Sequence, residues 1–329
     1  MDGINVNQKP RGRFAPSPSG RMHLGNAWTA LLAWLDIRKL GGTMVLRMED
    51  LDPDRSRAEY AAGLLEDLHW LGLDWDEGPD RQGAFAPYNQ SERFDLYLAA
   101  FETLIQQGLV YPCFCSRAQL RSNVSVASAP HAGEMEPVYS GRCGQLSAEE
   151  QRELTACKRQ SSYRLRVGSA ELAFVDLLFG PQMQSLRQCC GDFVIRRSDG
   201  VYAYQLAVVV DDAAMGINRI LRGADLLAST PRQIYLWQLL GFQPPDFIHV
   251  PLLMGADGSR LSKRQGSLTI AALRQFGMRP EQVVGHLAAW AGLVEQPEPL
   301  RPAELIDSFS LDRIPRTPVV VGDTFPLSI

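Results

Sequence analysis

The sequence predicts an α/β protein built on a parallel sheet, and three observations support this prediction. A short apolar strand at 13–15, a glycine-bearing turn, a helix over 24–40 and an apolar strand at 43–48 form a βαβ unit, whose strands run parallel. A polar, cysteine-rich stretch over 110–190 then interrupts the apolar pattern. The pattern returns from residue 192, so we expect one core that an insert divides into two halves.

Composition places the chain among ordinary globular proteins. It has 329 residues, 45% of them apolar, and its 33 basic and 37 acidic side chains give a formal net charge of −4. This balance excludes a uniformly cationic nucleic-acid-binding surface but not a local basic patch. The N-terminus lacks the apolar core of a signal peptide, and no apolar run approaches the ~18 residues of a membrane span. Six cysteines without an export signal indicate reduced thiols or metal ligands, so we expect a cytoplasmic protein.

The first half of the core is expected over 12–109. After the βαβ unit, amphipathic helices are predicted over 56–71 and 91–107. Ser91 is the expected N-cap of the second, because its hydroxyl can accept an orphan N–H of the first turn. The acidic side chains that follow the second strand are interpreted as acids at a helix start rather than as a magnesium site. They are Glu49, Asp50, Asp52 and Asp54.

The insert is expected over 110–191, the second half of the core over 192–255 and a short helical C-terminal region over 256–329. The insert should be irregular and β-rich, with a strand at 163–167. In the second half, strands at 193–195 and 201–210 flank the turn-forming Ser198-Asp199-Gly200, and Pro231 opens a helix. The remaining predicted elements are a strand at 247–254, a turn at Asp257-Gly258, and helices at 270–276, 281–291 and, weakly, 302–309.

One motif joins the first strand to the first helix and suits phosphate. It reads Arg13-Phe14-Ala15-Pro16-Ser17-Pro18-Ser19-Gly20-Arg21-Met22-His23-Leu24-Gly25-Asn26. A helix N-terminus presents free N–H groups and the positive end of a dipole, and glycine lets a ligand approach the backbone closely. His23 adds a further donor. Taken alone, a histidine next to a glycine more often belongs to an ordinary surface loop.

A second motif lies in a glycine-flanked loop late in the chain and reads Arg260-Leu261-Ser262-Lys263-Arg264. A lysine in such a loop is a mobile point charge that can follow the charge developing on a phosphate. Taken alone, such a run is more often a solvated basic turn.

Together, in this order and separated by most of the chain, the two motifs resemble the two signature sequences of class I aminoacyl-tRNA synthetases. The first is similar to the glutamyl-tRNA synthetase form, and the resemblance runs from about residue 13 to residue 316. Further similar segments are LRMEDLD at 46–52, AYQLAVVVDD at 203–212 and ILRGADLL at 220–227. The resemblance implies a Rossmann-like nucleotide-binding core, with His23 and Lys263 as catalytic residues. It implies ATP binding by His23, Gly25, Asn26 and Lys263.

The two motifs also depart from the family pattern. Asn26 replaces the final histidine of the first signature, while Arg260, Leu261 and Arg264 replace lysine, methionine and serine in the second. Charge is retained or the change is mild, so ATP chemistry is still expected. Mg²⁺ should accompany ATP, without a dedicated protein cage for it.

Length distinguishes the members of this family. Only 65 residues follow Arg264, too few for the C-terminal anticodon-binding domain of a glutamyl-tRNA synthetase. The chain therefore resembles the truncated glutamyl-Q tRNA(Asp) synthetase family, whose members activate glutamate with ATP in the absence of tRNA. They then transfer it to the queuosine base in the anticodon loop of tRNA(Asp). The alternatives are a compact glutamyl-tRNA synthetase that charges the tRNA 3′ end, and a non-catalytic RNA-binding paralogue.

The cysteine pattern points to the same family. Three thiolates, Cys113, Cys115 and Cys143, with one further donor can form a closed tetrahedral zinc site. Residue types alone leave metal-free buried thiols as an equal alternative, and they favour His131 as the fourth ligand. The resemblance implies Tyr139 instead, in a structural zinc site that would pin the insert. Cys157, Cys189 and Cys190 show no partner pattern.

A glutamate pocket needs cationic forks and a carboxylate, because free glutamate carries two carboxylates and one ammonium. The resemblance places these residues at the pocket: Arg13, Phe14, Ala15, Pro16, Ser17, Glu49, Tyr204 and Arg222. Arg13 and Arg222 suit carboxylates, Glu49 suits the ammonium and Tyr204 can donate its hydroxyl; which arginine takes the side-chain carboxylate stays open. Attack of the α-carboxylate on the α-phosphate of ATP would then give glutamyl-adenylate and pyrophosphate.

Transfer to tRNA needs an RNA-binding surface. Its candidates are the basic side chains that could contact phosphates, namely Arg187, Arg196, Arg197 and Arg219. A splayed anticodon-loop base would be read as in other single-stranded RNA loops. We expect the protein to act as a monomer, away from membranes.

Overall fold

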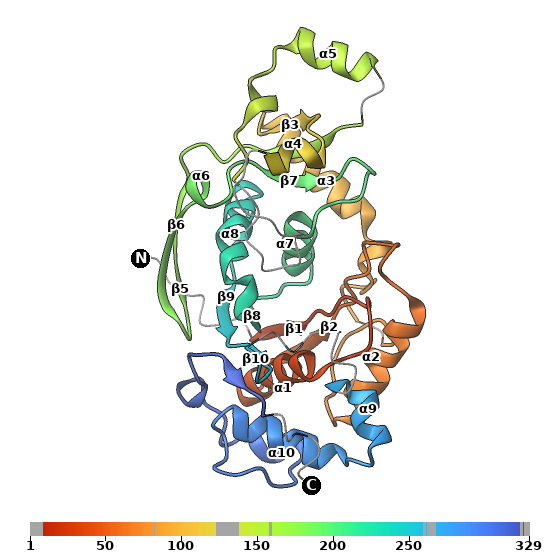
Figure 1. The fold of residues 1–329 in the computed structure, drawn as a ribbon, viewed down its shortest axis with the longest axis vertical. Coiled ribbons are helices and arrows are strands. Elements are labelled where there is room, and N and C mark those ends of the chain that lie inside the picture. Colours follow the sequence, from red (N-terminus) through yellow and green to blue (C-terminus); the bar gives the residue numbers. More distant parts are fainter. Residues whose placement is uncertain are drawn as a thin grey trace.

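A computed structural model gives the fold of the chain. It describes residues 9–81, 83–122, 138–157, 160–258, 261, 268–322 and 325. Figure 1 shows an elongated molecule with the cysteine-rich segment at one end, the C-terminal helices at the other and the sheet between them. Within the described part of the chain, no helix is both long and apolar enough to cross a membrane.

The βαβ unit is present. Strand β1 (Arg11–Phe14) leads through the first motif into α1 (Leu24–Lys39), and β2 (Thr43–Leu46) returns parallel to β1, with Arg13 opposite Val45. On the other side of β1, the N–H of Asn218 donates to the carbonyl of Arg11 at 3.1 Å. This bond brings β1 next to β8 (Arg219–Gly223), which pairs in parallel with β9 (Asp246–Val250). The predicted parallel-sheet α/β fold is therefore confirmed.

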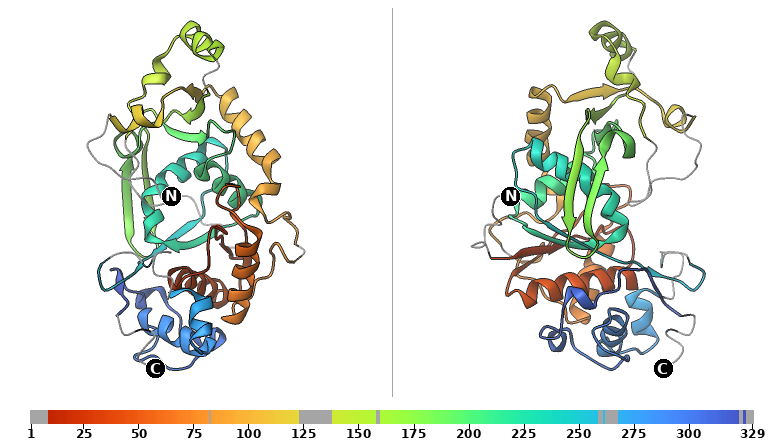
Figure 2. Two further views of the ribbon diagram at one scale, coloured as in Figure 1. Left: turned by 45° about the vertical axis from the view of Figure 1, so that its right-hand side comes forward. Right: turned by 90° about the vertical axis from the view of Figure 1, so that its left-hand side faces the viewer.

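Helix α1 is buried on almost every side, between the sheet and the C-terminal region. A Cβ on Gly12 would lie 2.4 Å from Cγ1 of Ile37, so β1 and α1 approach closely at this glycine. One hydrophobic cluster joins α1 to α9 (Ile270–Gln275) and α10 (Pro280–Trp290). Figure 2 shows these helices stacked on α1, away from the cysteine-rich end.

Two helices of the first half differ at their starts from the sequence prediction. Helix α2 covers Ala58–Trp70; after the 3-10 turn η1 (Gln90–Glu92), α3 covers Phe94–Gln106 with Arg93 as its N-cap. The prediction of Ser91 as N-cap is wrong. Its N–H and Oγ–H instead donate to the Asp50 carboxylate at 2.9 and 2.7 Å, because a charged acceptor outcompetes a helix turn.

The acidic string does not start a helix either. Glu49 accepts a hydrogen bond from Arg47, Asp50 accepts from Ser91 and Asp52 pairs with Arg197, all before the first turn of α2. The interpretation of these acids as a helix start is therefore wrong; three of them anchor neighbouring segments.

A small antiparallel sheet joins the cysteine-rich segment to the start of the second half of the core. Its strands are β3 (Val110–Cys113) and β4 (Ser162–Leu165) from that segment and β7 (Phe193–Arg196), which follows it. Short helical elements surround it, namely α4 (Arg117–Ser122), η2 (Arg142–Gln145), α5 (Ala148–Ala156) and α6 (Leu186–Cys189). The hairpin of β5 (Glu171–Asp176) and β6 (Gly180–Ser185) extends to the core, where Asp176 pairs with Phe247 of β9. The sheet order there is β6-β5-β9-β8.

The strand predicted at 201–210 is wrong. The turn at Ser198-Asp199-Gly200 exists, and Arg197 donates its N–H to Val201 at 2.8 Å, but the chain becomes helical at Tyr204. Helix α7 (Tyr204–Ala214) is buried from Leu206 to Asp212. A helix that is apolar on all sides leaves the same continuous pattern as a buried strand, so periodicity could not separate the two.

The remaining elements follow their predictions closely. After the 3-10 segment η3 (Ala224–Ser229), α8 (Thr230–Leu239) carries Pro231 in its first turn. The predicted strand at 247–254 is divided into β9 and β10 (Leu253–Met254), which pairs with β11 (Val319–Val320). The weak C-terminal helix is the 3-10 turn η5 (Pro302–Leu305), followed by η6 (Leu311–Arg313).

Candidate active site

The candidate site lies around the carboxyl-terminal ends of the parallel strands. Arg13 ends β1, Glu49 follows β2, Arg222 lies near the end of β8, and Tyr204 begins α7. Parallel strands present their carboxyl ends at one edge of a sheet, which is where ligands bind in folds of this kind. The topology thus collects residues that are far apart in the sequence.

Two buried arginines share one carboxylate at this edge. Arg47 donates through Nη1 to Oδ1 of Asp212 at 2.7 Å, and Arg13 donates to the same oxygen through Nε at 3.3 Å. Burial alone would raise the pKa of Asp212, but the guanidiniums of Arg47 and Arg13 outweigh it and hold that pKa below its ordinary value. Asp212 therefore stays ionised and fixes both arginines.

The preceding residue, Asp211, forms hydrogen bonds to the segment around η1 and α3. It accepts from Nε of Arg93 at 2.6 Å, from Oη of Tyr97 at 2.8 Å and from Nε2 of Gln90 at 2.7 Å. Asp211 is fully buried. These bonds attach η1 and α3 to α7, so the two consecutive carboxylates connect three elements behind the site.

Glu49 and Tyr204 are two further polar groups in the electrostatic field of these cations. Oε1 of Glu49 accepts from Nη2 of Arg47 at 3.1 Å, while burial raises the pKa of the Glu49 carboxyl. Burial and the Glu49 charge raise the pKa of Tyr204 to about 12, against the lowering effect of Arg222 and Arg13. Tyr204 is therefore a neutral hydroxyl donor at physiological pH.

Side chains from β9 and α8 hold Arg222 in place. Its Nε donates to Nε2 of His249 at 3.0 Å, and its Nη2 donates to Oγ1 of Thr230 at 2.8 Å. Its Nη1 is buried and has no hydrogen-bond partner among the described residues. Burial, with the charge of Arg13, lowers the pKa of Arg222 despite the opposing effect of Tyr204 and Asp212. The predicted residues Arg13, Glu49, Tyr204 and Arg222 are thus close enough to influence one another electrostatically.

The other predicted pocket residues form the strand-to-loop backbone. Phe14 and Pro16 are buried, Ala15 is half-buried and Ser17 is exposed. The carbonyls of Phe14 and Pro16 accept the N–H groups of Arg47 and Glu49, both at 3.0 Å. This pairing continues the parallel ladder beyond β2 and places Glu49 next to the first motif.

The first motif has the expected helix-start geometry. His23 is the N-cap of α1 in an extended conformation, and the N–H groups of Asn26 and Ala27 point to its carbonyl at 2.9 and 3.1 Å. A Cβ on Gly25 would lie 3.0 Å from the His23 ring, so this position favours glycine.

The segment after the second motif pairs with the first. His23 forms a β-bridge with Thr269, and the N–H of Ile270 donates to the carbonyl of Met22 at 2.9 Å. Leu261, inside the second motif, donates its N–H to Leu253 at 3.3 Å. The predicted catalytic Lys263 lies outside the described residues, as do Arg260 and Arg264.

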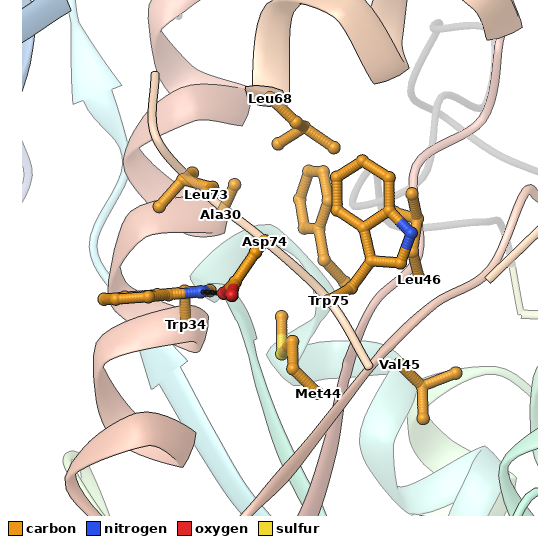
Figure 3. Close-up of a pocket in the computed structure, with 10 residues that line it drawn as sticks. Ala30, Trp34, Met44, Val45, Leu46, Leu68, Leu73, Asp74 and Trp75 are labelled. Carbon is orange, nitrogen blue, oxygen red and sulfur yellow. Dashed lines mark hydrogen bonds between the residues drawn. The ribbon is translucent and has the colours of Figure 1, made fainter. Parts of the chain in front are cut away.

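Two cavities lie near α1 and α2. The smaller, of about 10 Å³, is an apolar gap in the core behind Trp34 and Trp75, too small for a substrate (Figure 3). The larger, of about 220 Å³, lies between α2 and α9 and is lined mainly by charged and polar side chains. Its lining includes Arg21, Tyr60, Asp67 and Arg274. Arg21 belongs to the first motif and lies two positions before His23, so the cavity adjoins that motif.

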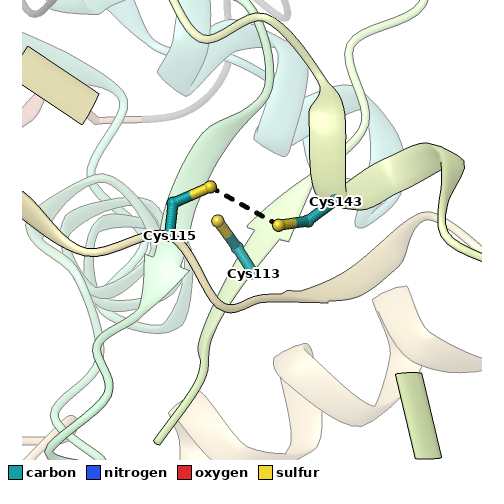
Figure 4. Close-up of side chains that lie close together, drawn as sticks. All are labelled: Cys113, Cys115 and Cys143. Carbon is teal, nitrogen blue, oxygen red and sulfur yellow. Dashed lines mark hydrogen bonds between the residues drawn. The ribbon is translucent and has the colours of Figure 1, made fainter. Parts of the chain in front are cut away.

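The three predicted cysteine ligands meet in one cluster. The Sγ atoms of Cys113, Cys115 and Cys143 all lie within 4.8 Å of one another, and Figure 4 shows them converging from two segments. The hydroxyl oxygen of Tyr139 lies 3.4 Å from Sγ of Cys113 and 3.7 Å from Sγ of Cys115. His131, the alternative fourth ligand, lies outside the described residues.

These distances fit a tetrahedral metal site. Donors about 2.0–2.3 Å from a central zinc lie roughly 3.3–3.8 Å from one another in a tetrahedron. The Sγ atoms of Cys115 and Cys143 are 3.5 Å apart, and the Tyr139 contacts fall in the same range. The cluster is therefore compatible with a metal ion. Cys157 and Cys189 are exposed, and Cys190 is buried elsewhere, against the carbonyl of Leu186.

The four arginines predicted to contact RNA differ in their intramolecular contacts. Arg219 pairs with Asp36 at 2.6 Å, and Arg197 pairs with Asp52 and Asp199 at 2.8 and 2.5 Å. Arg196 stacks over Phe101 and Tyr202. Arg187 is exposed on α6. Intramolecular carboxylates thus already engage two of the four.

Sequence reasoning misses the residues that support the site. It includes Arg47, Asp211 and Asp212 only as members of similar segments, and it assigns no role to Asp176 or His249. One signal was available: each is an ionisable residue within or next to an apolar run, and buried charges are rare unless they are paired.

Comparisons with known proteins agree with this geometry. A family model described as "tRNA synthetases class I (E and Q), catalytic domain" matches residues 9–318. Two curated proteins named glutamyl-Q tRNA(Asp) synthetase are similar over 94% of the chain: that of Symbiobacterium thermophilum is 56% identical (94% of its length), and that of Nitratidesulfovibrio vulgaris 51% (95%). A crystal structure of a glutamate tRNA ligase from Elizabethkingia meningosepticum in complex with its amino acid superposes with a TM-score of 0.81, at 27% identity, over 95% of this chain and 67% of that one.

Proposed function

Since the chain belongs to the class I tRNA synthetase family of the glutamate and glutamine type, we propose that it activates L-glutamate with ATP without tRNA. It then transfers the glutamyl group to the queuosine base in the anticodon loop of tRNA(Asp). The similarity that supports this over nearly the whole length is to the two glutamyl-Q tRNA(Asp) synthetases. We place its activity in the cytoplasm, where ATP, glutamate and tRNA occur together.

The observation that carries the glutamate assignment is the arrangement of Arg13, Arg222, Glu49 and Tyr204. Two cationic forks and one carboxylate complement the two carboxylates and the ammonium of glutamate. Burial strengthens each of these interactions, because little water competes with the substrate. Asp212 and Arg47 hold Arg13 and Glu49 in place before the substrate arrives.

Activation is an in-line displacement at phosphorus. A carboxylate oxygen of glutamate attacks the α-phosphorus of ATP, the bond from that phosphorus to the bridging oxygen breaks, and pyrophosphate leaves with its electron pair. The N-terminal N–H groups of α1, His23 and Lys263 stabilise the charge that develops on the phosphate oxygens. Pairing between the segments at His23 and Thr269 supports the convergence of the two motifs over one nucleotide. Mg²⁺ accompanies the ATP phosphates.

Zinc is the metal proposed for the cysteine cluster, with Cys113, Cys115, Cys143 and Tyr139 as ligands. A closed four-donor site has a structural role, because it leaves no open position for a substrate. Its position in Figure 1, at the end away from α1, supports that role. We retain the division into a core of 12–109 and 192–255, an insert of 110–191 and a C-terminal region of 256–329 as part of this proposal.

The decisive experiment is ATP–pyrophosphate exchange with purified protein. Glutamate-dependent exchange without tRNA is expected. Exchange that requires tRNA would favour a compact glutamyl-tRNA synthetase, and absence of exchange under all conditions would favour a non-catalytic RNA-binding paralogue. Transfer is tested with labelled glutamate and tRNA(Asp) with and without queuosine, and only the modified tRNA should become labelled.

A further inference from the structure

We propose that Asp176 and His249 are positioning residues that hold Arg222 so that its Nη1 group, which has no partner among the described residues, meets an anionic oxygen of the substrate. This inference rests on the proposed function, in which Arg222 contacts glutamate. Neither residue belongs to the sequence motifs, and both are separated from the substrate by Arg222 itself.

The chain of bonds begins at a carboxylate with no freedom to move. Oδ1 of Asp176 accepts the N–H groups of Leu178 and Phe179 at 3.0 and 2.8 Å. Oδ2 accepts the backbone N–H of His249 at 3.0 Å and lies 2.7 Å from its Nδ1. Asp176 is 1% exposed and His249 is 0% exposed. The pairing of Asp176 with Phe247 brings β5 to β9 at this point.

The hydrogen-bond pattern determines the protonation of the imidazole. Arginine nitrogens only donate, so Nε2 of His249, 3.0 Å from Nε of Arg222, must be an acceptor. The ring proton is therefore on Nδ1 and is donated to Asp176. The histidine is neutral, and the aspartate selects the tautomer that can hold the arginine.

Arg222 would not keep this orientation unaided. Asp212 and Glu49 attract its guanidinium and raise its pKa, while Arg13 repels it and lowers that pKa. A long side chain in that field has an alternative, which is to pair with one of the carboxylates. Bonds from Nε to His249 and from Nη2 to Thr230 prevent this. They leave Nη1 buried and unpaired among the residues that the structure describes.

An unpaired N–H of a buried cation is costly, and a substrate oxygen removes that cost. The proposed pocket residues Arg13, Glu49 and Tyr204 lie close enough to Arg222 to shift its pKa. Holding the donor in place before binding also reduces the ordering cost when the substrate binds. This explains why two buried polar residues support an arginine that could otherwise satisfy itself locally.

The test compares two polar replacements of His249 in the tRNA-independent exchange assay. In His249→Gln the amide oxygen can reach the Nε2 position and accept from Arg222. In His249→Asn the shorter amide faces Asp176 but cannot reach Arg222. His286→Asn on α10, a partly buried histidine far from the site, is the matched control.

We expect His249→Asn to raise the KM for glutamate roughly tenfold or more, as for the loss of a bond to a charged group, while the KM for ATP stays within about twofold. His249→Gln should recover most of the glutamate KM, and His286→Asn should change neither constant. Thermal unfolding of the variants is measured in parallel, so that a difference between Gln and Asn at equal Tm reports positioning.

Three outcomes overturn the inference. They are an unchanged glutamate KM in His249→Asn, equal defects in the Gln and Asn variants, and a parallel rise of both substrate constants. If the Asn variant does not fold, Asp176→Asn replaces it, because an amide there favours the tautomer with a proton on Nε2, which opposes Arg222. A glutamate KM unaffected by Asp176→Asn would equally overturn it. A parent protein without glutamate-dependent exchange would instead refute the proposed function.

Discussion

At the scale of single residues, the site is a set of buried charges whose roles depend on their neighbours. The role of Asp212 comes from its two partners: between Arg47 and Arg13 it stays ionised and fixes both cations at the end of the sheet. Asp211, one position earlier, bonds to a different set of partners in α3 and η1. Asp212 thus holds an arginine of the pocket, while Asp211, the residue before it on α7, attaches the elements behind the pocket.

Asp212→Asn should destabilise the protein by about 3 kcal/mol, because it leaves two buried guanidiniums without their shared carboxylate. Denaturant unfolding monitored by circular dichroism measures the loss. Asp307→Asn, at an exposed position, is the control and should change stability by less than about 0.5 kcal/mol. Equal midpoints for the two variants would show that the pairing contributes no stability.

Lys263→Ala should slow adenylate formation by roughly tenfold or more, since the charge that stabilises the transition state is lost. The glutamate-dependent exchange rate is the measurement. Lys39→Ala provides the comparison, because Lys39 is exposed and bonds only to the carbonyl of Asp307 in the described part of the chain. An exchange rate that survives Lys263→Ala would remove this lysine from the mechanism.

At the scale of elements, short connections do the positioning. The bridge between His23 and Thr269 attaches the start of α1 to the segment before α9, and the ladder beyond β2 places Glu49 beside the first motif. In the insert, β3 with the residues directly after it and η2 supply the thiols of the cysteine cluster from two segments (Figure 4). These elements have few apolar residues of their own, so a metal would contribute much of their local stability.

Cys113→Ser should reduce bound zinc below half of the parent level and make the segment around β3 more accessible to protease. A hydroxyl is a weak replacement for a thiolate in a tetrahedral zinc site. Zinc is measured by elemental analysis after dialysis. The matched variant Cys157→Ser changes an exposed thiol outside the cluster and should keep the parent zinc content. Full zinc content in Cys113→Ser would refute the ligand assignment.

At the scale of the whole molecule, the two larger hydrophobic clusters hold different sets of helices. One packs α1 against the C-terminal helices, and the other surrounds α7, α8 and α3. The buried polar network lies where strands from both clusters meet, so the stability of the fold depends on the ionisation of that network. Acidification should therefore lower the stability of the whole fold and not only of one segment.

Burial lowers the pKa of His249 to about 4, although its bond to Asp176 opposes the change. At pH values between about 6.5, its ordinary pKa, and about 4, His249 is protonated in the unfolded chain but neutral in the folded chain. The free energy of unfolding should therefore fall as the pH drops from about 6.5 towards 4, by up to about 3 kcal/mol from this group. Denaturant titrations across that range should show a steeper decline in the parent than in His249→Gln; identical slopes would contradict this.

Sequence reasoning succeeded where a local rule applied. Pro231 in a first turn and the strand–turn–helix context of His23 each indicate one local structure. It failed at 201–210 because a fully buried helix has no polar face, and at Ser91 because Asp50 lies 41 residues away. The support of Arg222 by His249 was also beyond sequence reach, since a lone histidine in an apolar strand does not reveal its partner.

The sequence by itself determined the βαβ start, the order of the two phosphate-related motifs, the three cysteines that form one cluster and the types of residue that suit glutamate. These depend on chain-local chemistry and spacing. Only the tertiary structure decided which charges are buried and with whom they pair, because burial and partnership arise from contacts between strands and helices far apart in the chain. The orientation of Arg222, fixed by residues from β5, β9 and α8, is such a property.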